Sequence, residues 1–199
     1  MPAHRYPGVP EQLPLDATLA KLRPWFEDVS KPKLAQNAKY DMAVLSRYGV
    51  RVAPVEDTML ISYVLEAGLH NHGMDELSKL WLGHAPIPFK QVTGTGKAQK
   101  SFKHVALEPA TSYAAEDADV TLRLYELLRP RLPREGLLSV YETLERPMAG
   151  VLADMECAGI RIDPERLRQL SNDFSVRMGE LEAEAHRLAG RPFNLGSPK

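Results

Sequence analysis

The chain has 199 residues, of which 44% are hydrophobic and 26% are charged, and its formal charge is −1. This composition is that of a folded globular protein and excludes disordered, collagen-like and disulfide-based classes. No apolar run approaches the ~20 residues of a membrane-spanning helix, and the N-terminus lacks the apolar core of a signal peptide. We therefore expect a soluble intracellular protein with one or two small domains, in which any nucleic-acid affinity comes from a local basic cluster.

Prolines and glycines divide the first part of the chain into short segments. Four prolines within residues 1–14 predict an extended arm without a hydrophobic core of its own. Asp16 is expected to cap a helix, and residues 33–35 fit a short strand. A second helix is expected to end at Gly49, and Asp57 to cap a third, strongly apolar one.

A further helix is predicted over residues 74–82, and the stretch from residue 77 to residue 107 contains no acidic residue. Its centre, residues 91–100, predicts a mobile loop. The stretch carries five lysines: Lys79, Lys90, Lys97, Lys100 and Lys103. Such a stretch can neutralise phosphate groups without any motif, and a merely solvated loop is an equally good interpretation.

A long helix is predicted from Glu108-Pro109 to about Leu128, since proline is favoured in a first helical turn. We place a domain boundary after it, at the prolines near residue 133. Residues 137–158 are helical by pattern, and Asp163-Pro164 starts a helix that reaches about residue 189. Its apolar residues are spaced by three and four: Leu167, Leu170, Phe174, Met178, Leu181, Ala185 and Leu188. Packing against the preceding helix is favoured over a dimeric coiled coil.

The single cysteine, Cys157, cannot form an internal disulfide, and its apolar neighbours favour a reduced, packed thiol. The four histidines between residues 70 and 104 lack compact metal-ligand spacing and are interpreted as surface or packing residues. Residues 93–97 lack the spacing of a phosphate-binding P-loop.

Tyr113 and Asp117 lie four residues apart and therefore share one face of the long helix. A phenol beside a carboxylate suits metal-assisted hydrolysis, because the carboxylate can hold a hard cation and the hydroxyl can orient a water molecule. From the residues alone, a solvated acidic face is the favoured alternative.

Residues 36–41 form a second candidate, at a strand-to-helix junction. Gln36 and Asn37 offer amide donors and acceptors, and Tyr40 offers a stacking face for a nucleotide. Asp41 in a first turn is stabilised by the helix dipole in any case, and this ordinary role is favoured on spacing alone.

Both candidates resemble exonuclease motifs of the bacterial DNA polymerase I family (family A). Residues 37–41 (Asn-Ala-Lys-Tyr-Asp) resemble its second motif, and residues 113–119 (Tyr-Ala-Ala-Glu-Asp-Ala-Asp) resemble its third. Shorter stretches are also similar: 57–60, 74–77, 119–122, 145–147, 159–164 and 193–197. The resemblance covers nearly the whole chain from about Leu13.

The resemblance implies an α/β, ribonuclease H-like exonuclease fold without its first strands, mostly helical, followed by a long helical hairpin of the polymerase thumb. The expected organisation is an extended arm at 1–14, a partial 3'-5' exonuclease domain at 15–136 and the start of the polymerase domain at 137–199. The implied function is proofreading hydrolysis of DNA 3' ends in replication and repair.

The resemblance also assigns roles to individual residues. It implies that Asp117 and Asp41 bind metal, that Tyr113 positions the attacking water, and that two divalent ions (Mg²⁺ or Mn²⁺) serve the complete domain. The residues expected to contact DNA are Gln36, Asn37, Tyr40, Lys97, Lys100 and Lys103. The implied partners are a single-stranded DNA 3' end and the remainder of a polymerase chain in the bacterial cytoplasm, with no membrane.

Two departures from the family pattern affect these expectations. The Asp-x-Glu of the first exonuclease motif has no counterpart, and Asn71 lies where the family commonly has arginine. We therefore expect a piece of a longer polymerase with weak metal binding, little or no activity alone, and an apolar patch that promotes self-association. A non-catalytic single-stranded DNA-binding or scaffolding module is the alternative, and a stand-alone nuclease is less favoured.

Overall fold

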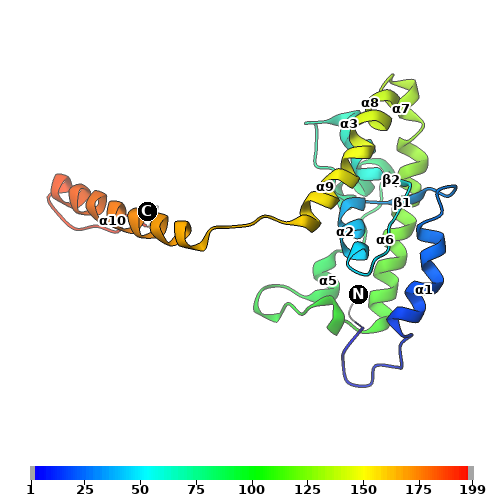
Figure 1. Ribbon diagram of the computed structural model, residues 1–199, viewed down its shortest axis with the longest axis horizontal. Coiled ribbons are helices and arrows are strands. Elements are labelled where there is room, and N and C mark those ends of the chain that lie inside the picture. The colour runs from blue at the N-terminus through cyan, green and yellow to red at the C-terminus, as the bar shows by residue number, and fades with distance from the viewer. Residues whose placement is uncertain (1–2, 197–199) are drawn as a thin grey trace. The chain divides into compact units, whose positions relative to one another are not determined.

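The computed structural model describes residues 3–196 and divides into two compact units, the first ending at Ala158 and the second starting at Gly159. Within these residues the fold is mostly helical, with a two-stranded parallel sheet in the first unit (Figure 1). No helix in this part of the chain is long and apolar enough to cross a bilayer. The predicted domain boundaries, at residues 14 and 136, stay predictions.

The first unit contains fourteen short elements around one long helix. In chain order they are α1 (Leu15–Phe26), β1 (Lys33–Ala35), α2 (Ala38–Ser46), β2 (Val55–Asp57), α3 (Thr58–Glu66), α4 (Met74–Leu77), the π-turn η1 (Ser78–Leu82), α5 (Phe89–Thr93), the 3-10 turns η2 (Gly96–Ala98) and η3 (Phe102–His104), α6 (Leu107–Leu128), α7 (Arg131–Arg134), α8 (Leu138–Val140), the π-turn η4 (Tyr141–Glu145) and α9 (Arg146–Ala158). The second unit consists of α10 (Pro164–Ala189) and its flanking residues.

The two strands run parallel, with Leu34 opposite Glu56 and Ala35 opposite Asp57. Each strand is followed almost at once by a helix, so that α2 and α3 both begin beside the carboxyl end of the sheet. In open α/β folds this edge is where ligand sites form, because loops and helix N-termini gather there. The sheet topology therefore places the start of α2, with its polar residues, at a favourable position for a site.

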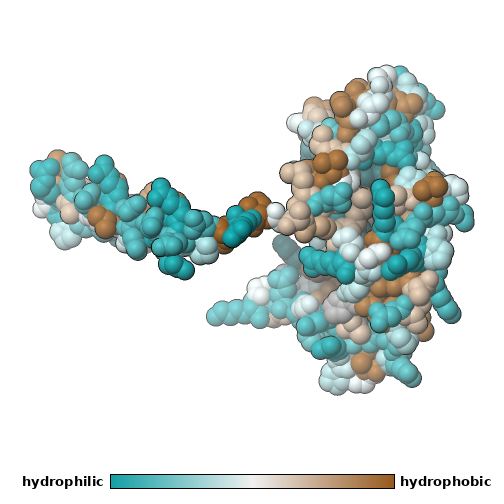
Figure 2. Space-filling view, in the orientation of Figure 1, coloured by the Kyte–Doolittle hydropathy of each residue, from teal (hydrophilic) through white to brown (hydrophobic). Residues whose placement is uncertain are grey.

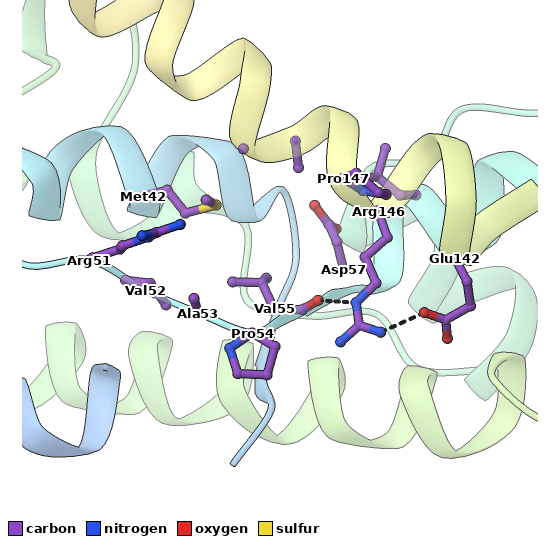
Figure 3. Close-up of a pocket in the computed structure, with 13 residues that line it drawn as sticks. Met42, Arg51, Val52, Ala53, Pro54, Val55, Asp57, Glu142, Arg146 and Pro147 are labelled. Carbon is purple, nitrogen blue, oxygen red and sulfur yellow. Dashed lines mark hydrogen bonds and ion pairs between the residues drawn. The ribbon is translucent and has the colours of Figure 1, made fainter. Parts of the chain in front are cut away.

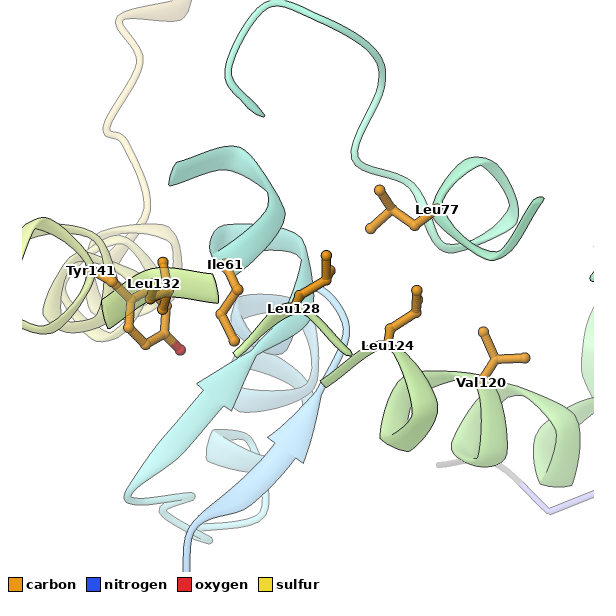
Figure 4. Packing of buried hydrophobic residues seen from close by; sticks show 7 residues of the cluster. All are labelled: Ile61, Leu77, Val120, Leu124, Leu128, Leu132 and Tyr141. Carbon is orange, nitrogen blue, oxygen red and sulfur yellow. The ribbon is translucent and has the colours of Figure 1, made fainter. Parts of the chain in front are cut away.

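A single hydrophobic cluster fixes α6 against its neighbours. In the second half of this helix every fourth residue faces inward, and Val120, Leu124 and Leu128 are fully buried. They pack with residues from α3, α4, α7 and η4, as Figure 4 shows: Ile61, Leu77, Leu132 and Tyr141. Burying these side chains stabilises the first unit and holds α6 against α3, α4, α7 and η4.

Several predicted elements are confirmed. The strand at 33–35 is present, and the long helix spans Leu107–Leu128. The Asp57 side chain caps α3, accepting a hydrogen bond from the Met59 N–H at 2.9 Å. The last predicted helix begins at Pro164, after a cap by Asp163, and ends before Gly190.

Three expectations are wrong. Asp16 does not cap α1, because the helix already begins at Leu15 and Pro14 occupies the N-cap position without a side-chain bond. Residues 91–100 are not simply a loop, since they contain the end of α5 and the turn η2. Cys157 is exposed, not packed, and its thiol lies 3.2 Å from the Ser46 hydroxyl.

The extended arm contacts the segment before α6. The Arg5 N–H donates to the Lys103 carbonyl at 2.6 Å, and the His4 ring donates to the Val105 carbonyl at 2.9 Å. The Leu107 N–H donates to the Tyr6 hydroxyl at 3.2 Å. The arm has no core of its own, as predicted, but these bonds attach it to the rest of the first unit.

Taken by itself, α10 is a 26-residue helix with no buried residue. The seam of apolar residues predicted along it is exposed over most of its length, with Phe174, Met178 and Leu188 among the exposed side chains. In Figure 2 its hydrophilic surface is interrupted by separate hydrophobic residues. The packing of this helix in a hairpin stays a prediction.

Candidate active site

Asp41 of α2 and Asp117 of α6 line one open pocket of about 370 Å³. Gln36, from the turn between β1 and α2, lines it as well. The rest of the wall is formed by small or apolar residues of β1, α4 and α6: Leu34, Ala35, Met74, Ala118 and Thr121. The fold thus brings together three of the residues singled out in two separate sequence motifs.

Asp57, at the end of β2, fixes the start of α2. It is only 3% exposed, and its carboxylate accepts hydrogen bonds from the N–H groups of Asn37 at 3.0 Å and Ala38 at 2.8 Å. Asn37 adopts a left-handed backbone conformation, with φ at 60°, which turns the chain from β1 into the helix. Since the same carboxylate caps α3, one buried side chain satisfies the first N–H groups of two helices.

The pKa values of three carboxyl groups in this region are raised. Burial raises the pKa of Asp57 although backbone N–H groups bond to it. Burial raises the pKa of Asp41, and the charge of Asp57 raises it further. Burial also raises the pKa of Asp117, with added repulsion from Asp75 and Glu116. Burial is the main cause in all three cases, and a cation bound beside these carboxylates would offset the cost of their ionisation.

Tyr113 lies one turn before Asp117 on α6. Burial, together with the negative charge of Asp117 and a hydrogen bond to it, raises the pKa of Tyr113 to about 12. The hydroxyl is therefore protonated at neutral pH and can donate a hydrogen bond. The Tyr113 ring contacts two others, those of Phe89 and Phe102, each with its centroid 5.9 Å away.

The residues predicted to contact DNA occupy different positions. The Gln36 amide is fixed, since it donates to the His72 carbonyl at 2.8 Å and accepts from the Thr58 hydroxyl at 2.5 Å. Asn37 and Tyr40 are exposed at the start of α2, and Tyr40 has 66% of its surface accessible. Neither of them lines the pocket that contains Asp41 and Asp117.

The three predicted lysines lie on the segment between α5 and α6, which projects from the first unit (Figure 1). Lys97 and Lys100 are exposed, and Figure 2 shows hydrophilic side chains on the projecting segment. Lys103 is half-buried, next to the N-terminal arm. The segment is thus able to present positive charge to solvent.

Asp41 and Asp117 are too few for a pair of tightly held divalent ions. Among the described residues there is no group of three or more histidine, cysteine, aspartate or glutamate side chains arranged to hold a metal. The two carboxylates suit one hard cation that keeps most of its water ligands. Two histidines pair with acidic side chains, His70 with Glu66 and His84 with Glu116, and His72 bonds the Ser62 hydroxyl.

A second pocket, of about 360 Å³, lies between β2, α2 and α9 (Figure 3). The positive charge of Arg146 in this pocket is already neutralised. Arg146 donates to the Val55 carbonyl at 2.8 Å and pairs with Glu142 at 2.6 Å and with the buried Glu56 at 3.2 Å. This arginine is a structural link between β2 and α9, and we assign no ligand to the pocket.

Sequence reasoning missed three features of this region. The sequence predicted that Asp57 caps α3 but not that it also holds the start of α2. The N–H groups at the start of α2 are brought to Asp57 by the pairing of β1 with β2. Sequence reasoning gave no role to Asp75 or Glu116, whose charges act on Asp117. The only available signal was that Glu116 directly precedes Asp117 and that Asp75 opens a predicted helix.

A parallel strand pair followed by helices, with acidic side chains from α2 and α6 in one pocket, is compatible with a ribonuclease H-like nuclease fold. Residues 6–133 match the 3'-5' exonuclease family of DNA polymerase A. The chain belongs to this family.

Its relatives include DNA polymerases I of several bacteria. The chain is 53% identical over 188 residues to DNA polymerase I of Rhizobium leguminosarum, covering 94% of this chain and 18% of that protein. It is 45% identical over 201 residues to DNA polymerase I of Pseudomonas aeruginosa, covering 99% and 22%. The chain therefore spans about a fifth of the length of these relatives.

Solved structures agree with this assignment. The POL domain of Pol1 from M. smegmatis, in complex with DNA primer-template and dNTP, matches with a TM-score of 0.72 and 26% identity over 94% of this chain and 29% of that one. Brucella melitensis NrnC with bound Mg²⁺ matches with a TM-score of 0.54 and 23% identity, covering 71% of this chain and 67% of that one. The latter similarity is one of fold alone.

Proposed function

We propose that this chain carries part of a metal-dependent 3'-5' exonuclease site that acts on DNA 3' ends, within a protein of the DNA polymerase I type. The observation that carries the proposal is the shared pocket of Asp41 and Asp117. These residues belong to two motifs far apart in the sequence, and a purely structural role would not require them to share a pocket. Family membership and the relatives' identity support the choice of DNA as substrate.

In this proposal Asp41 and Asp117 hold the cation. When bound, such an ion would neutralise charge that develops on the phosphate group. The number of carboxylates limits the site to one weakly held ion, with a dissociation constant of roughly 10⁻³ M. The two-ion arrangement of a complete domain needs further carboxylates, which the described residues do not provide.

Tyr113 would orient the attacking water molecule. Because its hydroxyl keeps its proton at neutral pH and bonds to Asp117, the hydroxyl oxygen would accept a hydrogen bond from the water and position it, while a carboxylate removes the other proton of the water. Gln36, fixed at both ends of its amide, would bind a group of the terminal nucleotide that reaches the pocket. Asn37 and Tyr40 would contact the neighbouring nucleotide, and the lysines Lys97, Lys100 and Lys103 would contact the phosphates of the same strand.

A nuclease assay tests the proposal. The purified chain is incubated with 5'-labelled single-stranded DNA and Mg²⁺ or Mn²⁺, beside Asp117→Ala prepared identically. We expect slow, stepwise shortening from the 3' end that is absent in the variant. Equal shortening by both proteins would identify a contaminating nuclease and contradict the assignment of Asp117.

Metal binding is measured separately, by the loss of the free Mn²⁺ signal in electron paramagnetic resonance. We expect one weak site in the wild-type chain, and its loss in both Asp41→Asn and Asp117→Asn. Single-stranded DNA affinity that is unchanged by a chelator, together with no Mn²⁺ site, would instead favour the non-catalytic DNA-binding module. The exposed lysines are the observation that favours this second candidate.

A further inference from the structure

Glu116 is adjacent to Asp117 but contacts a different part of the molecule. One of its carboxylate oxygens accepts a hydrogen bond from the His84 ring at 2.8 Å, and the other accepts one from the Ile87 N–H at 2.5 Å. Both partners lie in the irregular segment 83–88, between η1 and α5. A side chain of α6 therefore holds a segment that has no regular secondary structure of its own.

The position of this segment has consequences for its neighbours. The chain enters α5 directly after Pro88, and the first residue of α5 is Phe89. The Phe89 ring meets the Tyr113 ring edge-on and stacks on Phe102, with centroids 6.0 Å apart and planes inclined by 17°. Displacing residues 83–88 would therefore move an aromatic ring that contacts Tyr113.

The same segment supports the lysine-bearing chain. After α5 the chain forms a loop that is closed by a hydrogen bond, in which the Lys100 N–H donates to the Thr93 carbonyl at 2.9 Å. The residues that follow this loop are attached to the N-terminal arm through Arg5 and Lys103. Glu116 holds the residues that precede α5, so the lysine-bearing segment is held on both sides.

We propose that Glu116 is a positioning residue, which holds α5 and the lysine-bearing segment on α6 and thereby places them for single-stranded DNA. The inference rests on the proposed function for its DNA part. The attachment itself is a property of the chain, whatever it binds. Its cause is geometric: the two carboxylate oxygens each accept a hydrogen bond from a different residue, which fixes both the distance and the orientation of the segment.

Two substitutions of the same residue separate the hydrogen bonds from the charge. Glu116→Ala removes both acceptors, whereas Glu116→Gln keeps an oxygen that can accept from the Ile87 N–H. Asp119→Ala is the matched control, because it removes the same charge from the same helix at an exposed position, where Arg123 is paired at 3.5 Å.

Hydrogen exchange followed by mass spectrometry measures the attachment. In Glu116→Ala we expect exchange across residues 84–93 to be faster by about tenfold, with residues 118–128 unchanged. Glu116→Gln should restore most of the protection, and Asp119→Ala should leave it as in the wild type. Unchanged exchange at 84–93 in Glu116→Ala would overturn the proposal.

Single-stranded DNA affinity measures the consequence, by fluorescence anisotropy with a labelled oligonucleotide and no added metal. We expect about a tenfold loss in Glu116→Ala and less than a threefold loss in Glu116→Gln. Faster exchange with unchanged affinity would overturn the DNA part and leave the attachment. A wild-type chain that binds no oligonucleotide would contradict the proposed function, and the exchange result would still decide the attachment.

Discussion

Asp41 and Asp117 reach the same pocket from helices that are stabilised in different ways. Asp41 lies in a nine-residue helix in which Ala38 alone is buried, and its first turn depends on hydrogen bonds to Asp57. Asp117 lies in the middle of a 22-residue helix with five buried residues. The start of α2 is thus set by a polar contact from a neighbouring strand while the rest of the helix packs against α9, and the position of α6 is set by a hydrophobic seam.

This difference implies two kinds of failure. Loss of packing along α6 should affect the whole first unit, because α3, α4, α7 and η4 pack on the same cluster. Loss of the cap on α2 should affect mainly the start of that helix, since the rest of the helix is also held by its packing against α9. The predictions below test this distinction, from the largest expected effect to the smallest.

The largest effect is expected from Leu124→Ala. This side chain is fully buried in the cluster, and its truncation should lower the free energy of unfolding by about 3 kcal/mol. Urea denaturation followed by circular dichroism measures it. Leu127→Ala, at a position 41% exposed on the same helix, should cost less than about 1 kcal/mol. Equal costs at the two positions would show that the cluster does not hold α6.

Asp57→Ala should lower the free energy of unfolding by about 2 kcal/mol, because it leaves buried N–H groups at the starts of α2 and α3 without an acceptor. Hydrogen exchange should accelerate at residues 37–41 and 59–61 before it does so along α6. Asp57→Asn keeps one acceptor and should lose less. Hydrogen exchange that accelerates equally in α2 and α6 would show that the Asp57 cap and the hydrophobic cluster do not stabilise these helices independently.

Local patterns predicted the elements whose cause is local. Pro109 near the start of the long helix and Asp57 before an apolar run each indicated a helix that the structure confirms. The capping of α2 by the same aspartate could not be predicted in this way. It depends on the pairing of β1 with β2, which places the Asn37 and Ala38 N–H groups beside a residue about twenty positions later.

The candidate site followed the same rule. The spacing of Tyr113 and Asp117 predicted their common helix face, and the hydrogen bond between them agrees with it. The contacts of Glu116 with His84 and Ile87 depend on tertiary structure, and no spacing in the sequence indicates them. The residues that act on the site through long-range contacts therefore became visible only in the folded chain.

Tyr141→Phe tests a contact that reaches β2 from η4. The Tyr141 hydroxyl donates to the Glu56 carboxylate at 2.9 Å and accepts from the Asp57 N–H at 3.2 Å. Its removal should lower the free energy of unfolding by about 1.5 kcal/mol, since both partners are buried. Tyr125→Phe, in the same assay, is the control for loss of a phenol hydroxyl on a partly exposed residue. A cost below that of the control would mean that β2 does not depend on this hydroxyl.

The smallest effect, and the only one of opposite sign, is expected from Asp41→Asn. Burial and the charge of Asp57 raise the pKa of Asp41 in the folded chain, so the ionised carboxylate destabilises that state at neutral pH. Removing the charge should increase the free energy of unfolding at pH 7 by about 0.5 kcal/mol, a gain limited by solvent screening of a partly exposed group. Asp16→Asn, in the first turn of α1 but exposed, should instead lose a few tenths of a kcal/mol.

The pH dependence fixes the sign of this last effect. A folded-state pKa above the unfolded value means that the folded chain binds more protons between the two values. The wild-type chain therefore gains stability relative to Asp41→Asn as the pH falls from neutral through the folded-state pKa towards 3.8, and the advantage of the variant disappears in that window. Urea denaturation of both proteins at several pH values measures the difference. An advantage that persists at the lowest pH would show that it comes from packing, and that Asp41 is not held at an electrostatic cost beside Asp57.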